Sequence, residues 1–464
     1  MSGIFRIDDP YRGDVVAERK SLTAGEIEGV VARAARAQHA WARTALGDRV
    51  ALCERFCAAF EQDGERIATE ITRQMGKPLQ QARGEVKTAL ARARHMMSIA
   101  PQALADEPLP DVPGFTRLVR HEPVGVVLDI SAWNYPLLIT VNVVVPAVLA
   151  GDAVLIKHAT RTALCGEAFE RAFASAGAPE GLVTAVHADH DVCAQIITRP
   201  EIGYVSFTGS VRGGHEIYRE VSARFIDAGL ELGGKDPAYV APDADLGHAI
   251  ANLVDGAFYN AGQSCCGIER IYVHRSLYDR FVEGALAEVR KLRMGDPMDA
   301  ATTLGPMAQP GAPEKLEGQV QEARAKGGRV LCGGRPVKVG GKGRFFDPCI
   351  VADASHQVHG LMVEESFGPI VGIARVADDD EAVRLMNDSP YGLTAAIWTR
   401  DQERAFRIGA QIDTGTFFMN RCDYLDPALP WTGVKDSGKG NSLSRYGFLS
   451  LTRRKSFHLR TQTS

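Results

Sequence analysis

Short apolar segments alternate with longer helical ones from residue 124 onward, and this alternation restricts the fold more than any other feature of the chain. VGVVLDI (124–130), AVLIK (153–157) and LVTAV (182–186) each have the length and β-branched content of one buried strand. A segment of helical length and composition follows each of them, the first beginning at about Pro136. Strands that alternate with helices in this way predict a parallel, doubly wound α/β sheet.

The same rhythm covers two further segments and then restarts, which predicts a second α/β domain. YVSFTGS (204–210) and ARFIDAGLELG (223–233) complete the first series, while AYVA and RIYVH belong to a second series beyond residue 235. The 464 residues give room for two or three domains at about 100–200 residues per domain. Residues 24–100 are predicted to be helical, because their apolar residues recur at three- and four-residue spacing.

Two other stretches lack this alternation. Residues 107–123, EPLPDVPGFTRLVRHEP, are rich in proline and are predicted to be extended. Residues 420–464 are expected to return to the first domain or to reach a partner subunit.

Charge and hydrophobic content argue against several classes of protein. Hydrophobic residues make up 45% of the chain and charged residues 24%, and the net charge of −4 gives no general affinity for nucleic acid or anionic membranes. The longest apolar run, residues 136–150, is shorter than the ~20 residues that span a bilayer and predicts a buried helix. The first residues show no basic-then-apolar signal pattern, so a cytoplasmic location is expected.

The nine cysteines indicate reduced thiols rather than a disulfide framework. They are scattered apart from the pair Cys265 and Cys266, and no CxxC motif or Cys/His cluster has zinc spacing, so no metal is expected. Cys265 lies in AGQSCCGIER, a polar turn with glycines that small molecules reach. A thiol there becomes a nucleophile if its pKa is lowered, although a lone cysteine is more often a buried structural residue.

Three more segments place polar residues where an apolar run ends. In LELGGKDP, Glu231 is either a general base or an ordinary surface residue. In SAWNYP, Asn134 either offers its side-chain NH₂ to an oxyanion or caps the following helix. FTGSVRGG (207–214) is a strand end, a glycine turn and a helix start, which lets phosphate oxygens approach backbone N–H groups, although it is not a GxGxxG motif.

The order of these motifs resembles that of the aldehyde dehydrogenase superfamily over essentially the full length of the chain. The matching elements are WNYP, VLIK, FTGS, LELGGK, GQSC, EESFGP and the C-terminal Trp-Thr-Gly-Val-Lys-x-Ser-Gly stretch. Each element alone would be a turn or a strand end, but seven matches in one order are highly specific. The resemblance implies an α/β fold with a Rossmann-like cofactor-binding domain, an α/β catalytic domain and a small β oligomerisation element.

The resemblance also implies a division of the chain and a homodimer or homotetramer. The implied segments are residues 1–106 and 124–232 for the NAD(P)-binding domain, 233–419 for the catalytic domain, 107–123 and 450–464 for the oligomerisation element, and 420–449 for the return to the cofactor domain at the substrate mouth. The implied partner is a small-molecule aldehyde, with no nucleic acid or membrane.

In the catalytic machinery that the resemblance implies, Cys265 rather than Cys266 is the nucleophile. Its thiolate attacks the aldehyde and gives a thiohemiacetal, whose oxyanion is held by the Asn134 side chain and the Cys265 N–H. Losing one such donor typically costs ~10²–10³ in rate. Hydride transfer to the nicotinamide leaves a thioester. As general base, Glu231 would activate the water that hydrolyses this thioester, and it would also help to deprotonate the thiol. Superfamily members that transfer the acyl group to coenzyme A usually lack this glutamate, so the free acid is the expected product.

The resemblance also implies a binding site for NAD or NADP. Lys157 would bind the adenosine ribose, Ser210 would lie near the pyrophosphate, and Glu365 would hold the nicotinamide ribose. The other implied cofactor-site residues are Trp133, Gly209, Gly214 and Phe367.

Three positions depart from the pattern of many relatives. NAD-preferring relatives often carry a glutamate where this chain has Thr160, beside Arg161, which gives a slight lean towards NADP or dual use; alternatively Thr160 is neutral and NAD dominates. The C-terminal Ser-Gly-x-Gly-Arg-Glu stretch here ends in Asn441-Ser442, so its carboxylate is absent and more of the base work falls on Glu231. Cys266 either lines the pocket, the favoured interpretation, or protects the nucleophile by reversible oxidation.

The substrate is the least determined feature. The stretch NRCDYLDPALP (420–430) is expected to line the substrate mouth, where Arg421 would pair with the carboxylate of a semialdehyde such as succinic semialdehyde, or would form a surface salt bridge. Two other classes remain as alternatives: a non-catalytic binding protein of the same fold, and a cysteine hydrolase that needs no cofactor.

Overall fold

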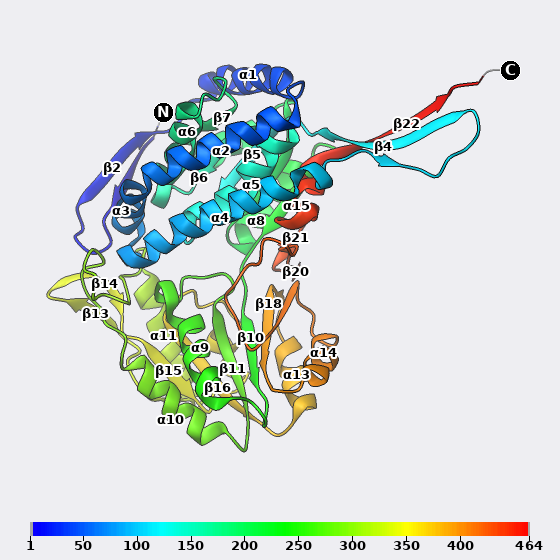
Figure 1. Cartoon of the computed structure of the whole chain (residues 1–464). Coiled ribbons are helices and arrows are strands. Elements are labelled where there is room, and N and C mark those ends of the chain that lie inside the picture. Colours follow the sequence, from blue (N-terminus) through cyan, green and yellow to red (C-terminus); the bar gives the residue numbers. More distant parts are fainter. Residues whose placement is uncertain (1–2, 463–464) are drawn as a thin grey trace.

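The computed structural model describes residues 3–462, which form two lobes and a projecting arm (Figure 1). Each lobe has its own hydrophobic core. The first core is built mainly from residues between Ile27 and Leu232, and the second from residues between Ala238 and Ile412. The chain therefore passes from one core to the other between Leu232 and Ala238, shortly after Glu231.

The first lobe is built on a six-stranded sheet with the order β21-β9-β8-β5-β6-β7. Its strands are β5 (Val126–Ser131), β6 (Ala153–His158), β7 (Val183–Ala185), β8 (Ile202–Thr208), β9 (Asp227–Glu231) and β21 (Gly438–Lys439). Strands β5 to β9 are parallel, and only β21 joins antiparallel. The order reverses between β5 and β8, where such sheets open a crevice for a ligand. The predicted doubly wound sheet is confirmed.

Eight α-helices of the described chain accompany this sheet. They are α1 (Ala24–Trp41), α2 (Leu46–Gln62), α3 (Gly64–Met75), α4 (Leu79–Ala103), α5 (Pro136–Ala150), α6 (Ala163–Ser175), α7 (His190–Ile197) and α8 (Val211–Ser222). Helix α5 is apolar on nearly every side because it lies between the sheet and α4, as a buried helix requires. None of the helices within residues 3–462 is both long and apolar enough to cross a lipid bilayer.

The second lobe holds a seven-stranded sheet with the order β12-β15-β16-β11-β10-β18-β19, in which only β12 pairs antiparallel. Its strands are β10 (Asp236–Val240), β11 (Ile268–His274), β12 (Arg329–Val330), β15 (Cys349–Ala352), β16 (Ile370–Val376), β18 (Thr394–Trp398) and β19 (Thr416–Met419). Its helices are α9 (Leu246–Phe258), α10 (Tyr278–Val289), α11 (Ala312–Ala325), α12 (His359–Met362), α13 (Asp379–Asn387) and α14 (Gln402–Gly409). The second α/β unit predicted beyond residue 235 is thus present.

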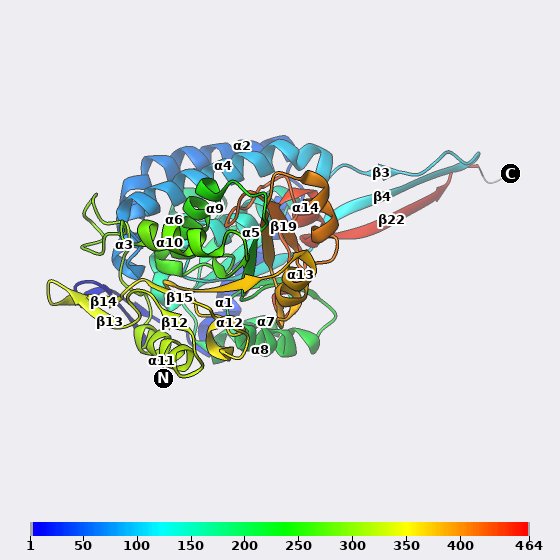
Figure 2. The same cartoon turned by 90° about the horizontal axis from the view of Figure 1, so that it is seen from below.

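The arm consists of β3 (Glu107–Pro108), β4 (Phe115–Pro123) and β22 (Thr452–Arg460), and it extends away from both lobes (Figures 1 and 2). Strands β4 and β22 pair antiparallel, from Thr452 opposite Pro123 to Arg460 opposite Phe115. The C-terminal segment also joins the lobes. In it, β20 (Val434–Lys435) pairs with β17 (Tyr391–Gly392) of the second lobe, β21 pairs with β9 of the first, and α15 (Ser444–Ser450) leads into the arm.

Two hairpins lie outside the sheets. They are β1 (Ile4–Asp8) with β2 (Val15–Lys20), and β13 (Pro336–Val339) with β14 (Lys342–Phe346). Two short 3₁₀ turns, η1 (Thr160–Thr162) and η2 (Tyr259–Gly262), carry residues of the site described next.

Candidate active site

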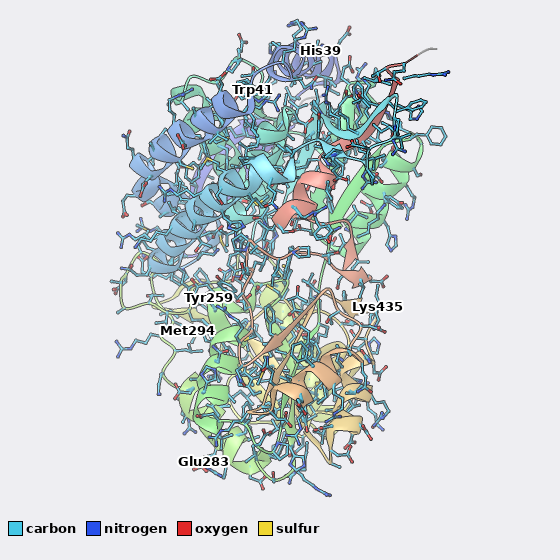
Figure 3. The ribbon with its side chains drawn as sticks, turned by 45° about the vertical axis from the view of Figure 1, so that its right-hand side comes forward. His39, Trp41, Tyr259, Glu283, Met294 and Lys435 are labelled. Atoms are coloured by element: carbon cyan, nitrogen blue, oxygen red, sulfur yellow. The ribbon has the colours of Figure 1, made fainter. Side chains whose placement is uncertain are left out.

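A cavity of about 300 Å³ lies between the two lobes, and Cys265, Glu231 and Asn134 all line it. Tyr259, another lining residue, marks its place between the lobes in Figure 3. The remaining lining residues are Gln81, Gly84, Glu85, Thr88, Arg92, Tyr135, Leu138, Ile139, Asn142, Thr208, Asn252, Asp255, Gly256, Cys266, Cys422, Asp423, Tyr424, Leu425 and Trp431. The volume is at the lower end of the ~300–1,000 Å³ typical of ligand pockets, which suits a small substrate.

Cys265 lies on a cross-linked turn between η2 and β11, and it is partly exposed to the cavity. Asn260 and Ala261 have left-handed backbones, with φ of 53° and 55°, which are costly for residues other than glycine. Side-chain amides hold this turn: Gln263 Nε2 donates to the Asn260 carbonyl at 3.0 Å, and Asn260 Nδ2 donates to the Gln263 carbonyl at 3.1 Å. The turn that presents the thiol is therefore rigidly built.

The glycines of the LELGGK motif let three parts of the site approach one another. A side chain at Gly234 would collide with the Cys265 carbonyl oxygen. A Cβ at Gly233 would lie 2.8 Å from the Glu365 carboxylate oxygens. The sequence needs both glycines because the stretch after Glu231 passes between the thiol-bearing turn and Glu365.

Asn134 follows β5 and is fixed through its backbone rather than its side chain. Its carbonyl accepts hydrogen bonds from Lys77 Nζ at 2.8 Å and from Asn260 Nδ2 at 3.1 Å. Within residues 3–462 its side-chain amide makes no hydrogen bond, so its NH₂ group is available at the cavity wall. Because Asn260 also holds the Cys265 turn, the two groups that would bind an oxyanion are tied to one another.

Lys77 and Glu85 form a buried ion pair beneath Asn134, a feature that the sequence patterns did not reveal. Lys77 Nζ bonds to Glu85 as well as to the Asn134 carbonyl, and Glu85 Oε1 accepts the backbone N–H of Leu137 at 2.8 Å. The pair thus braces the turn from β5 into α5. The only local signal is a lysine before a proline at a helix start, which does not distinguish a brace from a surface charge.

Glu231 ends β9 and receives two hydroxyl groups. Ser442 Oγ donates to its Oε1 at 2.5 Å, and Thr208 Oγ1 donates to its Oε2 at 3.4 Å. Burial raises the pKa of Glu231, and the two hydroxyl groups oppose that rise. Ser442 stands where many relatives have a second glutamate, so this chain places a hydrogen-bond donor against the first carboxylate instead of a second base.

Replacing Ser442 with alanine is expected to move the acid limb of the kcat profile to higher pH. A general base acts only when deprotonated, so activity rises with pH through its pKa. Without the Ser442 hydroxyl, burial raises the pKa of Glu231 further, and less enzyme is active at any pH below it. Steady-state kcat across the acid and neutral range measures the shift. Thr208→Val, which removes the longer bond, should move the limb less; an unmoved limb in Ser442→Ala would contradict this role.

Cys266 points to a carboxylate rather than into solvent. Its Sγ donates to Asp423 Oδ1 at 3.0 Å, and Ser264 Oγ donates to the same oxygen at 2.9 Å. A hydrogen bond with Cys265 and burial raise the pKa of the Cys266 thiol well above its usual value. This geometry favours the cavity-lining interpretation of Cys266.

The 420–430 stretch contributes to the cavity, but not through the residue that we singled out. Asp423, Tyr424 and Leu425 line the cavity. Arg421 is exposed and is not among the lining residues; its guanidinium stacks on the Tyr424 ring, 3.5 Å from the ring centroid. Arg421 is therefore not placed to pair with a bound carboxylate.

The residues predicted to bind the cofactor in the first lobe lie at or after the carboxyl ends of parallel strands. Ser210 caps α8 and accepts the backbone N–H of Gly213 at 3.2 Å. A Cβ at Gly209 would lie 2.6 Å from the Phe207 ring, and one at Gly214 would lie 2.6 Å from Leu232, so the turn and the helix start both require glycine. This cradle at a helix N-terminus fits a pyrophosphate.

Lys157 is the penultimate residue of β6, and within residues 3–462 it makes no ion pair, which leaves its cation for a ligand. Burial lowers the pKa of Lys157. Thr160 begins η1 close by and is half-buried. Arg161 is engaged elsewhere, because its Nη1 donates to the Asp8 carbonyl at 2.8 Å and to Asp8 Oδ1 at 2.6 Å. Arg161 is therefore not free to contact a 2′-phosphate.

Glu365 and Phe367 come from the second lobe and meet the first lobe. Glu365 Oε1 accepts the backbone N–H of Gly234 at 3.0 Å, and burial, followed by the neighbouring Glu269, raises the pKa of Glu365 to about 7. Phe367 packs edge to face with Trp133, with 5.4 Å between ring centroids and 79° between the rings. The two predicted cofactor residues of the second lobe thus contact the first lobe at Gly234 and Trp133.

Comparisons with known proteins agree with this arrangement. The model of the Aldehyde dehydrogenase family matches residues 2–457. The chain is 35% identical to the succinate-semialdehyde dehydrogenase [NADP(+)] of Deinococcus radiodurans, over 97% of this chain and 94% of that protein. It is 34% identical to a succinate semialdehyde dehydrogenase [NAD(P)+] of Escherichia coli, over 95% and 94%. The solved structure of succinic semialdehyde dehydrogenase from Streptococcus pyogenes, in complex with NADP+, superposes with a TM-score of 0.94 at 30% identity, covering 98% of this chain and 100% of that one.

Proposed function

The chain belongs to the aldehyde dehydrogenase family, and from this premise we propose that Cys265, Glu231 and Asn134 carry its NAD(P)-dependent oxidation of an aldehyde to the free acid. One observation supports the assignment above all others: a partly exposed thiol, a half-buried carboxylate and an unengaged amide line the same small cavity. Intact chemistry of this kind disfavours a non-catalytic binding protein of the same fold.

In the proposed reaction, the Cys265 thiolate adds to the carbonyl carbon, and the oxygen becomes an oxyanion beside Asn134 Nδ2 and the Cys265 N–H. The nicotinamide dinucleotide, when bound, supplies the hydride acceptor. Loss of hydride from the thiohemiacetal carbon restores the carbonyl and leaves a thioester on Cys265. Glu231 then takes a proton from water, the water oxygen adds to the thioester carbon, and cleavage of the C–S bond releases the acid and returns the thiolate.

For the dinucleotide, we propose that Lys157 binds the adenosine ribose, and that Ser210 with the N–H groups at the start of α8 holds the pyrophosphate. Support comes from the glycine-bounded cradle at Gly209 and from the free Lys157 cation. Glu365 would hold the nicotinamide ribose, since its carboxylate is anchored beside Gly233.

Replacing Thr160 with glutamate is expected to lower kcat/KM for NADP+ by at least about tenfold and to change NAD+ little, because like charges brought together cost several kcal/mol. Position 160 begins η1 directly after the strand that carries Lys157. Steady-state assays with each cofactor give the ratio. Thr160→Val, which is uncharged and similar in shape, is the matched control; an unchanged ratio in Thr160→Glu would show that this position does not face the 2′-phosphate.

For the substrate we propose a semialdehyde, an aldehyde that carries a carboxylate. Support comes from the names of the relatives, which are succinate-semialdehyde dehydrogenases, and from the small volume of the cavity. A steady-state assay with NAD+ and NADP+ across aliphatic, aromatic and carboxylated aldehydes, with the acid product identified, tests the proposal. Absence of reduced cofactor with every aldehyde would refute it, and ester hydrolysis without cofactor would favour a cysteine hydrolase instead.

We also propose that residues 107–123 and 450–464 form the oligomerisation element of a homodimer or homotetramer; residues 463 and 464 lie outside the described chain. Support comes from the arm, whose nine-residue strands β4 and β22 extend from the body with Leu459 exposed. Light scattering of the full chain measures the assembly. The proposed cofactor-binding and catalytic segments, 1–106 with 124–232 and 233–419, agree with the positions of the two hydrophobic cores.

A further inference from the structure

A buried arginine lines the cavity without an ion-pair partner among the described residues. Arg92, on α4, is only 5% exposed, and among the cavity-lining residues of the described chain it is the one cation. No carboxylate within residues 3–462 lies within ion-pair distance of it. Burying a charge is costly unless it is paired and hydrogen-bonded, so this position calls for an explanation.

The hydrogen bonds of Arg92 are as incomplete as its charge pairing. Its Nη1 donates to Asn142 Oδ1 at 3.3 Å, a long bond, and its buried Nε has no partner within the described residues. A guanidinium carries five N–H donors in a planar fork, so most of them are unused. Asn142 is 4% exposed, and its side-chain oxygen accepts the hydrogen bond from Arg92. Its NH₂ group is left for a ligand in the cavity that Asn142 lines.

Most carboxyl groups around the cavity have partners of their own. Glu85 is paired with Lys77, Glu231 accepts Ser442 and Thr208, and Asp423 accepts Ser264 and Cys266. The remaining lining carboxyl, Asp255, belongs to an exposed residue, and loss of hydration raises its pKa, as it does for Asp423 and Glu231. None of these four groups forms an ion pair with Arg92 in the described chain, although the charges of Glu231 and Glu85 reach it from a longer distance.

We propose that Arg92, with Asn142 beside it, binds the carboxylate at the far end of the substrate and so selects ω-oxo carboxylates. The inference rests on the proposed function, because it assigns a role within the same cavity as Cys265. A carboxylate matches the guanidinium fork and accepts two parallel N–H bonds, and it supplies the missing counter-charge. The Asn142 NH₂ group adds a further donor to the same anion.

Two alternatives to carboxylate binding by Arg92 can be distinguished from it by experiment. The carboxyl groups of Asp255 and Asp423 would suit a cationic aldehyde instead. Alternatively, Arg92 would only lower the pKa of Glu231 by its charge, since it acts on that carboxyl group in this direction. A role in tuning Glu231 affects every substrate equally, whereas binding of a carboxylate affects only substrates that carry one.

The test compares kcat/KM for succinic semialdehyde, for the uncharged butanal and for the cationic betaine aldehyde in the wild type and in Arg92→Gln. The variant is expected to lose on the order of 10²-fold on succinic semialdehyde, the typical cost of truncating one partner of a buried charge pair, and to keep butanal within about threefold. Arg92→Lys keeps the charge but not the fork and should show a smaller loss. Arg94→Gln is the matched control: Arg94 lies on the same helix, is 54% exposed and pairs with Glu61, so its loss should change nothing.

Equal losses of Arg92→Gln on succinic semialdehyde and butanal, with a shifted pH profile, would overturn the inference in favour of tuning. A wild-type preference for betaine aldehyde would overturn it in favour of a cationic substrate. Equal use of butanal and succinic semialdehyde by the wild type would also overturn it, because the cavity would then not select a carboxylate. These outcomes leave the proposed function standing. Only a wild type that oxidises none of the three aldehydes with either cofactor counts against the proposed function itself.

Discussion

Replacing Cys265 with alanine is expected to lower kcat by at least about 10⁴-fold, because the covalent intermediate then has no sulfur to form on. The loss should fall on turnover and not on cofactor affinity, since the proposed dinucleotide contacts at Lys157, Ser210 and Glu365 lie on other elements. Steady-state kcat and the quenching of protein fluorescence by NADPH measure the two quantities on the same preparation.

The neighbouring cysteine provides a matched control. Cys266 lines the same cavity and is one residue away, but its thiol is donated to Asp423 and its pKa is raised. Cys266→Ala is therefore expected to keep kcat within about tenfold, the loss coming from the altered cavity wall. If Cys266→Ala abolished turnover while Cys265→Ala retained it, the nucleophile would have been assigned to the wrong sulfur.

Sequence periodicity predicted the strands and helices of the first sheet closely, because each buried strand is a short apolar run with clear ends. The ends of the individual strands have local causes. The strand end, glycine turn and helix start predicted in 207–214 are present, because β8 stops at Thr208 and Ser210 caps α8. The segment 223–233 becomes strand only from Asp227, after a fully exposed Phe225.

The site was predictable only where a motif marks it. Arg92 and Arg94 lie in the same helical run, ARARHMM, and no local pattern tells them apart. Arg92 is buried at the cavity and Arg94 pairs with Glu61 at the surface, because the face of α4 that meets α5 is set by tertiary packing. For Arg421 the sequence left substrate binding and a surface role open, because its place in a loop near the substrate does not determine where its side chain points.

Hydrogen bonds between residues that are far apart in the sequence also could not be predicted from the sequence. Ser442 was noted only as the absence of a carboxylate, yet in the structure it bonds to Glu231, which precedes it by more than two hundred residues in the chain. The pairing arises because β21 returns from the C-terminal segment and places Gly438 opposite Glu231. Such contacts depend on topology, which a single chain's periodicity leaves open.

Replacing Glu231 with glutamine is expected to let each active site produce one equivalent of reduced cofactor and then stop. Glutamine has the shape of glutamate and still accepts a hydrogen bond from Ser442 through its carbonyl oxygen, but it cannot take a proton from water. Thiohemiacetal formation and oxidation would proceed on Cys265, and the thioester would persist. The steady-state kcat should fall by about 10²–10⁴-fold, the usual contribution of a general base.

Stopped-flow absorbance measures the burst of reduced cofactor, and intact-protein mass spectrometry detects the acyl group on the stalled enzyme. The wild-type acid limb, set by the raised pKa of Glu231, should be missing from the residual turnover because glutamine does not titrate. Adding hydroxylamine, a nucleophile that needs little help from a base, should restore turnover of the variant. If the burst disappeared together with kcat, Glu231 would act before the thioester, in deprotonating Cys265, and hydroxylamine would then restore nothing.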